Sequence, residues 1–419
     1  MPGRRAPRFA AAAAVVALTL SVAACAPEAS VAIELPAQVE ATLGDEVTAQ
    51  LQTAMETAIA ASGATGAIVD VRAPWSGTWT QAFGTSTADG AKVTTEMPFK
   101  VGMVTRLMTC DVLYAMADAD KVNLDDSVTR WLNGYPAAEN MTLGQLCDGS
   151  SGLKSYSSEL SDRWFANPPR DWNPRELAAY GYAQGVAFQP GTAFRDSDTG
   201  YVLLGLALER ASGLSAAELY QKYVFEPIGM TSSSLPAKAQ TDGSWLAGLW
   251  SPNGEDGKVS CDTWQDVTAL SPSAGYTAAG VVSTVDDLSR YIQSVATSAR
   301  SYDTENRFAE PFSLGDKQPS WYTATGGAYQ AGSLIGQFGG VPGYLVAAFA
   351  DTETGMSVVV VLNDSRASSN LVRSLAWQLA AIASKAPAAS GQTAPEAGLP
   401  WEAATYAKAV EDTAICALP

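Results

Sequence analysis

Histidine is absent from the sequence, and its absence limits the chemistry that this chain can perform. Without an imidazole, the chain cannot form a Ser-His-Asp triad or use a histidine as a general base. A metal site that needs histidine ligands is excluded for the same reason.

Positive charge is also scarce. The 419 residues include 26 Lys and Arg against 43 Asp and Glu, which gives a formal net charge of −17. Such an acidic surface repels phosphate backbones, so we expect no nucleic-acid partner. Charged residues make up 16% of the chain and hydrophobic residues 47%, enough to bury a sizeable core.

The N-terminus carries the features of an export signal. Arg4, Arg5 and Arg8 precede an apolar run over residues 9–20, and small residues follow it. A basic stretch, a short apolar segment and a small-residue cleavage site are typical of a secretory signal, here residues 1–24. The apolar run is short for a transmembrane helix.

The signal ends in residues 22–25 (VAAC), which resemble the bacterial lipobox. That motif implies lipidation of Cys25, and two or more acyl chains make a stable anchor. We therefore expect an exported protein that is lipid-anchored to the outer face of the cell membrane, with residues 25–36 as a tether.

Four further cysteines, Cys110, Cys147, Cys261 and Cys416, form an even set. Export permits disulfides, and four cysteines allow three pairings. Two pairs of buried free thiols are the alternative.

Hydrophobic patterning indicates an α+β fold. Helices are predicted over residues 37–62, 104–119, 200–211 and 366–384, and strands over 67–71, 77–82, 343–350 and 356–362, the last two around a turn at 351–355. Strands at both ends of a helical middle imply an antiparallel sheet closed by distant segments. We expect one domain over 37–384, a Pro/Ala/Gly-rich linker over 385–400, and a C-terminal segment, 401–419, that docks on the domain through a short helix at 401–415.

Several segments between residues 60 and 380 resemble the serine β-lactamase-related family, which includes class C β-lactamases, DD-peptidases and related esterases. They are residues 99–102 (FKVG), 121–126 (KVNLDD), 141–146 (MTLGQL) with 150–153 (SSGL), 190–195 (PGTAFR), 199–205 (TGYVLLG), 225–230 (FEPIGM), 279–288 (AGVVSTVDDL) and 339–344 (GGVPGY). The resemblance implies a β-lactamase/transpeptidase-like fold, an antiparallel sheet flanked by helices plus a mainly helical subdomain. The family fold also favours the pairings Cys110–Cys147 and Cys261–Cys416.

The catalytic positions that the resemblance assigns have all changed. The family nucleophile motif S-x-x-K places a serine and a lysine base on one helix face. Here Met103 and Arg106 stand at those positions. Met103 has no oxygen with which to attack, and Arg106 remains protonated and cannot act as a base. Either change should abolish formation of an acyl-enzyme.

The two other family motifs are altered as well. In place of Y-x-N the chain has Asp196-Ser197-Asp198, and at the K-T-G or H-x-G position it has Gln337-Phe338-Gly339. Because the family fold brings the second motif opposite the first, we predict an Arg106–Asp196 ion pair that plugs the former site, with Asp198 nearby. The alternative is that both charges point into water.

Other interpretations of these residues carry less weight. Ser151 and Lys154 form a literal S-x-x-K, but Gly152 makes a helix there unfavourable. Asp196, Asp198 and Asp148 would suit calcium, although Asp196 and Asp198 would point apart on a strand. Glycosidase chemistry by a pair of these carboxylates is not supported by the surrounding sequence segments. A sugar groove lined by four tryptophans is less expected than core packing: Trp131, Trp164, Trp172 and Trp321.

The sequence therefore leaves three hypotheses. The preferred one is a catalytically inactive lipoprotein, without metal or other cofactor, that binds a peptidoglycan fragment, peptide or envelope protein in the former cleft. The second is an active serine hydrolase that uses a displaced nucleophile such as Ser151. The third is a purely scaffolding protein whose cleft is closed by side chains.

Overall fold

The computed structural model describes residues 33–87, 90–239, 241–255, 257–396 and 398–418, together with Met1 and Gly3. Cys25 and the expected signal segment lie outside these residues. Within the described ranges, no helix is both long enough and apolar enough to cross a bilayer.

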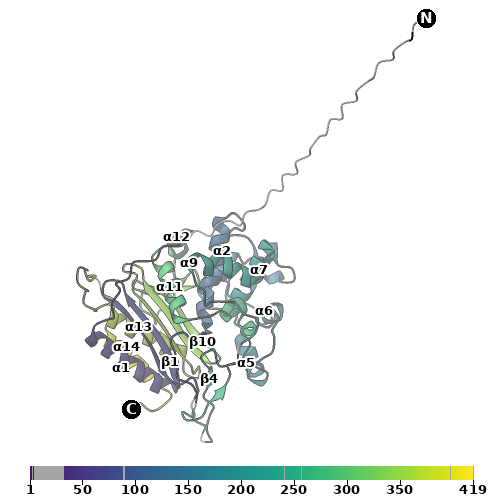
Figure 1. Cartoon of the computed structure of the whole chain (residues 1–419). Coiled ribbons are helices and arrows are strands. Elements are labelled where there is room, and N and C mark those ends of the chain that lie inside the picture. Colours follow the sequence, from purple (N-terminus) through teal and green to yellow (C-terminus); the bar gives the residue numbers. More distant parts are fainter. Residues whose placement is uncertain are drawn as a thin grey trace. The chain divides into compact units, whose positions relative to one another are not determined.

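The central element is an eight-stranded antiparallel sheet with the strand order β2-β1-β12-β11-β10-β9-β8-β7 (Figure 1). Strands from both ends of the chain meet in it, because β1 pairs with β12. The strands are β1 (Gly66–Ala73), β2 (Gly77–Gly84), β7 (Phe312–Ser313), β8 (Tyr322–Thr325), β9 (Ala328–Ala331), β10 (Leu334–Val341), β11 (Tyr344–Asp351) and β12 (Ser357–Leu362).

Two hydrophobic cores lie on opposite faces of this sheet. Along β12, Val358 and Val360 enter one core, whereas Val359 and Val361 enter the other. The first core is covered by α1 (Asp45–Ser62), α13 (Ser369–Ala383) and α14 (Ala403–Asp412), and the second includes α11 (Val285–Ala296). A strand buried on both faces needs a continuous apolar run, and β12 supplies it.

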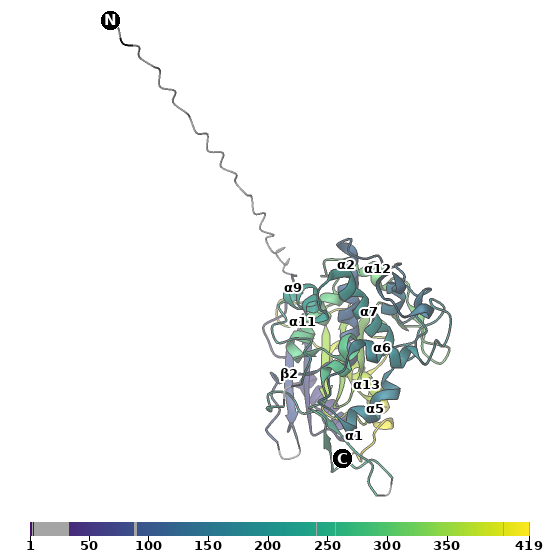
Figure 2. The same ribbon diagram turned by 90° about the vertical axis from the view of Figure 1, so that its right-hand side faces the viewer.

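A helical part of the molecule lies against the sheet beside β10 (Figures 1 and 2). Its helices are α2 (Thr105–Asp118), α3 (Val128–Trp131), α4 (Leu143–Cys147), α5 (Ser157–Ala166), α6 (Pro174–Tyr182), α7 (Asp198–Ser212), α8 (Ala216–Tyr220), α9 (Glu226–Ile228), α10 (Tyr276–Ala279) and α12 (Thr304–Phe308). Two short strand pairs complete the fold: β3 (Phe99–Lys100) with β6 (Val282–Ser283), and β4 (Leu249–Trp250) with β5 (Gln265–Asp266).

Local signals explain where the main elements begin and turn. In α7 the Ser197 hydroxyl accepts a hydrogen bond from the Gly200 N–H, so the helix starts at Asp198. At the β11–β12 turn, the Asp351 carboxylate accepts hydrogen bonds from the N–H groups of Glu353 and Thr354. Gly355 follows with φ of +73°, a conformation that favours glycine.

The predicted helix over 37–62 begins later than expected. Thr42 forms a bridge with Thr78, and the Leu43 N–H donates to the Thr78 carbonyl, so residues 42–43 run beside β2. The helix starts at Asp45, where Asp45 and Glu46 suit its positive N-terminal end. The predicted helices over 366–384 and 401–415 are likewise shorter, at 369–383 and 403–412.

The C-terminal segment packs on the domain. The Trp401 ring stacks on Trp377 with 5.1 Å between centroids, and its indole N–H donates to the Trp377 carbonyl. The disulfide Cys261–Cys416 ties the segment to the body of the molecule. Residues 385–400 contain no helix or strand in their described part, and Trp75 donates a hydrogen bond to the Ala386 carbonyl there.

Candidate functional site

Met103 and Arg106 lie where the chain enters α2. Residues Gly102–Val104 form a tight 3-10 turn, and the α-helix follows from Thr105. Gly102 has φ of +56°, so the chain turns sharply before the helix. Met103 and Arg106, three residues apart, both face the junction between the helical part and the sheet, as their contacts below show.

Arg106 is buried, and its charge is neutralised by two carboxylates. Its guanidinium forms ion pairs with Asp196 and with Asp198, and only 1% of its side chain is exposed. Its Nε donates to the Ala278 carbonyl at 3.3 Å, and its Cζ lies 5.2 Å from the centre of the Tyr201 ring. The ion pair expected between Arg106 and Asp196 is therefore present, with Asp198 as an equal partner.

The charges in this cluster shift one another's pKa values. Burial alone would lower the pKa of Arg106, but the negative charges of Asp196 and Asp198 raise it further above its usual range. Burial raises the pKa of Asp196, and the neighbouring Asp198 adds to this increase, against the lowering effect of Arg106. Arg106 consequently stays cationic and cannot accept a proton.

The expectation that Asp196 and Asp198 point apart was wrong. Ser197 between them has an extended backbone (φ −139°, ψ 111°), and side chains two residues apart on an extended chain lie on the same side. Both carboxylates therefore converge on Arg106.

Met103 occupies the space next to strand β10. A Cβ atom added at Gly339 would lie only 2.2 Å from the Met103 sulfur. The thioether thus packs directly against the backbone of the strand that, by resemblance, carries the third family motif. A glycine at 339 is what permits this close approach.

Both polar atoms of the Gln337 side chain are hydrogen-bonded to backbone groups. Its side chain is buried, its Nε2 donates to the Gly327 carbonyl at 3.1 Å, and its Oε1 accepts from the Phe338 N–H at 2.8 Å. Gln337 is not among the residues that line the neighbouring cavity.

A cavity of about 60 Å³ remains beside Met103. Its walls include Lys100, Tyr156, Trp164 and Asp198. This volume holds a few water molecules, whereas small-molecule sites are roughly 300–1,000 Å³. Side chains therefore fill the cleft that the family resemblance implies.

Lys100 was not among the site residues expected from the sequence, yet it lines this cavity. It is 1% exposed, and its Nζ donates to the Thr268 carbonyl at 3.2 Å. Burial lowers the pKa of Lys100 to about 7, opposed by the negative charge of Asp266. The sequence around Lys100, residues 99–102 (FKVG), gave no signal of this burial.

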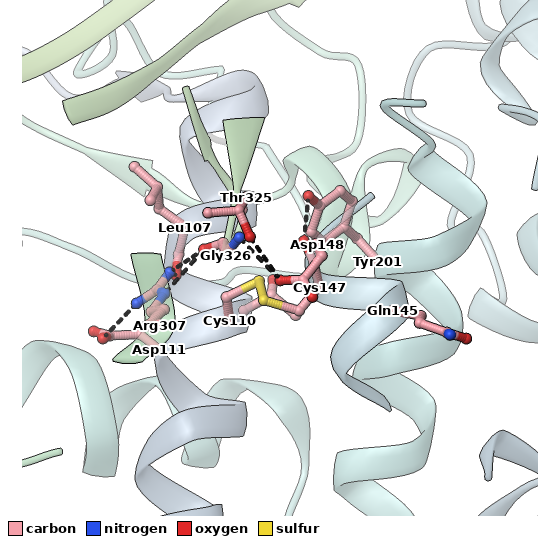
Figure 3. Close-up of a disulfide and its surroundings, with 12 residues drawn as sticks. Leu107, Cys110, Asp111, Gln145, Cys147, Asp148, Tyr201, Arg307, Thr325 and Gly326 are labelled. Atoms are coloured by element: carbon pink, nitrogen blue, oxygen red, sulfur yellow. Dashed lines mark hydrogen bonds and ion pairs between the residues drawn. A yellow bond between two sulfur atoms is a disulfide. The ribbon is translucent and has the colours of Figure 1, made fainter. Parts of the chain in front are cut away.

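Two buried contacts fix α2 in place (Figure 3). The disulfide Cys110–Cys147 joins it to the end of α4, with 5.4 Å between the Cα atoms. The next residue, Asp111, forms ion pairs with Arg300 at 2.6 Å and Arg307 at 3.2 Å, and all three side chains are buried. Both disulfides that the resemblance favoured are thus present in the structure.

Asp148, the third suggested calcium ligand, is used elsewhere. Its carboxylate accepts hydrogen bonds from the Gly326 N–H at 3.0 Å and the Thr325 hydroxyl at 3.4 Å (Figure 3). Burial raises the pKa of Asp148. In the described part of the chain, no group of three or more Asp, Glu, His or Cys side chains is arranged to hold a metal ion.

Ser151 lies in a loop rather than on a helix. Gly152 has φ of +74°, and Leu153 bridges to Val186. The Ser151 hydroxyl is buried and accepts a hydrogen bond from the Leu153 N–H. This geometry does not give the hydroxyl and the Lys154 amine the shared helix face that the S-x-x-K motif requires.

The four tryptophans do not form one groove. Trp164 lines the small cavity, and Trp131 lines a separate groove over α6 and α7. Trp172 lies under the Arg170 guanidinium, and Trp321 joins the Trp377 and Trp401 cluster.

The sheet, the helical part beside β10 and the α2 entry define a β-lactamase/transpeptidase-like fold. The model of the Beta-lactamase family matches residues 51–382, and the chain belongs to that family.

Known relatives and solved structures agree with this assignment. Penicillin-binding protein 4* of Bacillus subtilis is 27% identical over 143 residues, which are 32% of this chain and 30% of that protein. A D-stereospecific amidohydrolase from Streptomyces sp. has a TM-score of 0.66 at 21% identity, covering 76% of this chain and 94% of the other. A D-amino acid amidase from Ochrobactrum anthropi also gives 0.66, at 20% identity and with 76% and 92% covered.

The first prediction concerns the buried charge cluster. The substitution Arg106→Met leaves two carboxylates facing each other without a cation. Breaking a buried ion pair in this way costs about 3–5 kcal/mol, so we expect a loss of that size in the free energy of unfolding, measured by urea titration at pH 7. The variant R106M/D196N/D198N removes all three charges and should recover most of the loss. An R106M variant as stable as the wild type would contradict the pairing.

The second prediction concerns Lys100. Because its pKa falls from 10.5 to about 7 on folding, the unfolded chain takes up the proton first as the pH is lowered. Lys100 therefore destabilises the fold progressively from about pH 10.5 to 7, and fully below pH 7. Lys100→Met should raise the free energy of unfolding at pH 7 by about 1–3 kcal/mol, allowing for the lost hydrogen bond.

This gain should shrink as the pH approaches 10. Lys121→Met, at an exposed position, serves as the matched control and should change stability little at either pH. A gain at Lys100 that does not vary with pH would show that the amine is not neutral when buried.

Proposed function

We propose that this chain is a catalytically inactive member of the β-lactamase family with a binding or scaffolding role at the cell envelope. The proposal rests on the side chains that stand at the start of α2, Met103 and Arg106. Met103 offers no nucleophilic oxygen there, and its thioether packs on Gly339. Arg106 is held in ion pairs with two carboxylates, so no group at that position takes up a proton.

The size of the remaining cavity bears on the kind of role. A space of about 60 Å³ leaves no room for a peptidoglycan fragment or a peptide in the former cleft. The packing therefore favours a protein that holds partners by another surface over one that binds a ligand in the former cleft. A peptidoglycan fragment, peptide or envelope protein remains the expected class of partner.

An active serine hydrolase with Ser151 as displaced nucleophile is the alternative. The names of the relatives, a penicillin-binding protein and a D-stereospecific amidohydrolase, keep this reading open for the family. The loop geometry of Ser151 and its hydrogen bond from Leu153 speak against it.

A labelling experiment separates these two readings. The full-length chain, incubated with a fluorescent penicillin and in parallel with a fluorophosphonate probe, should show no fluorescent band on a denaturing gel. A penicillin-binding protein treated in the same way provides the positive control, and Ser151→Ala is the matched variant. A band in the wild type that disappears in Ser151→Ala would establish the displaced nucleophile. A band that persists would place the ester on another serine, and either result would overturn the proposed inactivity.

The envelope role rests on the N-terminal sequence. We propose that residues 1–24 are removed and that lipid on Cys25 holds the protein at the outer face of the membrane, with residues 26–36 as the remainder of the tether.

Fractionation tests this anchor. In bacterial cells fed a labelled fatty acid, the wild type should carry the label and sediment with membranes. Cys25→Ser should lose the label and shift to the soluble or unprocessed fraction, whereas Ser21→Ala keeps the cysteine and should behave as the wild type. Equal labelling of the Cys25→Ser variant would rule out this site of lipidation.

A further inference from the structure

A groove of about 670 Å³ lies on the helical part of the molecule, away from the filled cleft. It is formed by the end of α3, the turn that follows, α6 and α7; the last two helices run next to each other in Figures 1 and 2. Its volume falls within the range of roughly 300–1,000 Å³ that is typical of ligand sites. None of the residues in the three family motifs lines it.

Aromatic rings form much of its wall. Trp131, Tyr135 and Tyr182 line the groove, and each is partly exposed. The Tyr135 and Tyr182 rings meet edge to face with 5.2 Å between centroids, which holds them in a fixed relative orientation. The Trp131 indole N–H is buried and has no hydrogen-bond partner in the described structure, so Trp131 contributes its ring rather than its N–H to the wall.

Two cations rim the groove. Arg175, on α6, and Arg210, in the last turn of α7, are both exposed. Neither side chain forms a salt bridge among the residues that the structure describes. The one lining carboxylate, Glu209, accepts a hydrogen bond from the Ala216 N–H at 2.7 Å, so it is already engaged. In a chain with a net charge of −17, two unpaired guanidinium groups beside aromatic rings form a distinct positive site.

We propose that this groove binds an acidic glycan segment. Aromatic faces bind the apolar C–H faces of pyranose rings, and guanidinium groups bind carboxylates through paired hydrogen bonds. This site goes beyond the proposed function, because it supplies a ligand class to a protein whose former cleft is filled. An acidic peptide, which would use the arginines alone, is the competing occupant.

Calorimetry on the full-length chain in detergent tests the proposal. Two acidic probes are used: trigalacturonate, and the disaccharide of N-acetylglucosamine and N-acetylmuramic acid. Maltotriose serves as the neutral glycan and hexaglutamate as the acidic peptide. We expect at least one acidic glycan to bind, with a Kd at least tenfold lower than that of maltotriose or hexaglutamate. Tighter binding of trigalacturonate would indicate a uronate ligand, and tighter binding of the disaccharide would indicate the carboxylate of N-acetylmuramic acid.

Matched variants locate the binding. Trp131→Ala and the double variant Arg175→Gln/Arg210→Gln should each raise the Kd at least tenfold. Lys92→Gln/Lys121→Gln removes two exposed cations elsewhere and should leave it unchanged. Thermal unfolding of each variant controls for folding, and Trp131→Phe, which keeps a ring, should retain most of the affinity.

Three results would overturn the proposal. They are no saturable binding of either acidic glycan, binding that survives Trp131→Ala, or hexaglutamate binding as tight as that of the glycans. Because these variants do not touch the α2 entry, their outcome is independent of the penicillin labelling.

Discussion

Arg106 carries a full positive charge where only 1% of its side chain reaches solvent, and several neighbouring segments are arranged around that charge. A buried guanidinium without a counter-charge would cost several kcal/mol, so the fold must supply carboxylates at contact distance. Asp196 supplies one from the loop before α7, and Asp198 supplies the other from the first turn of that helix. The position of the α7 start, and with it the wall of the former cleft, therefore depends on the charge of one residue on α2.

Buried polar contacts also hold α2 at a second position along the helix. Asp111 forms ion pairs with both Arg300 and Arg307. The adjacent Cys110 is bridged to Cys147 (Figure 3). With Arg106 paired one turn earlier, α2 is anchored in its first two turns. Enzyme sites commonly leave a cleft beside such a helix, but here the Met103 side chain fills that space against Gly339. The region therefore has the packing of a hydrophobic core.

Much of the fold and part of the site could be predicted from the sequence, and the limits have physical causes. The apolar runs on either side of the turn at 351–355 predicted the β11–β12 hairpin, and the family resemblance predicted the Arg106–Asp196 ion pair. The sequence placed Asp198 only near this pair, because its direct contact with the guanidinium depends on where α7 begins. The burial of Lys100 and the groove around Trp131 depend on segments that are far apart in sequence, and no local pattern reports such packing.

The Cys261–Cys416 bridge has a topological consequence. It closes a covalent ring of the polypeptide, with a sequence separation of 155 residues, that contains β7 to β12 and the helices α11, α13 and α14. A protease that cut once in the irregular stretch 385–400 would produce a nicked molecule whose last helix is still attached. The two fragments would separate on a denaturing gel only after reduction, because the Cys261–Cys416 disulfide still joins the C-terminal fragment to the rest of the chain.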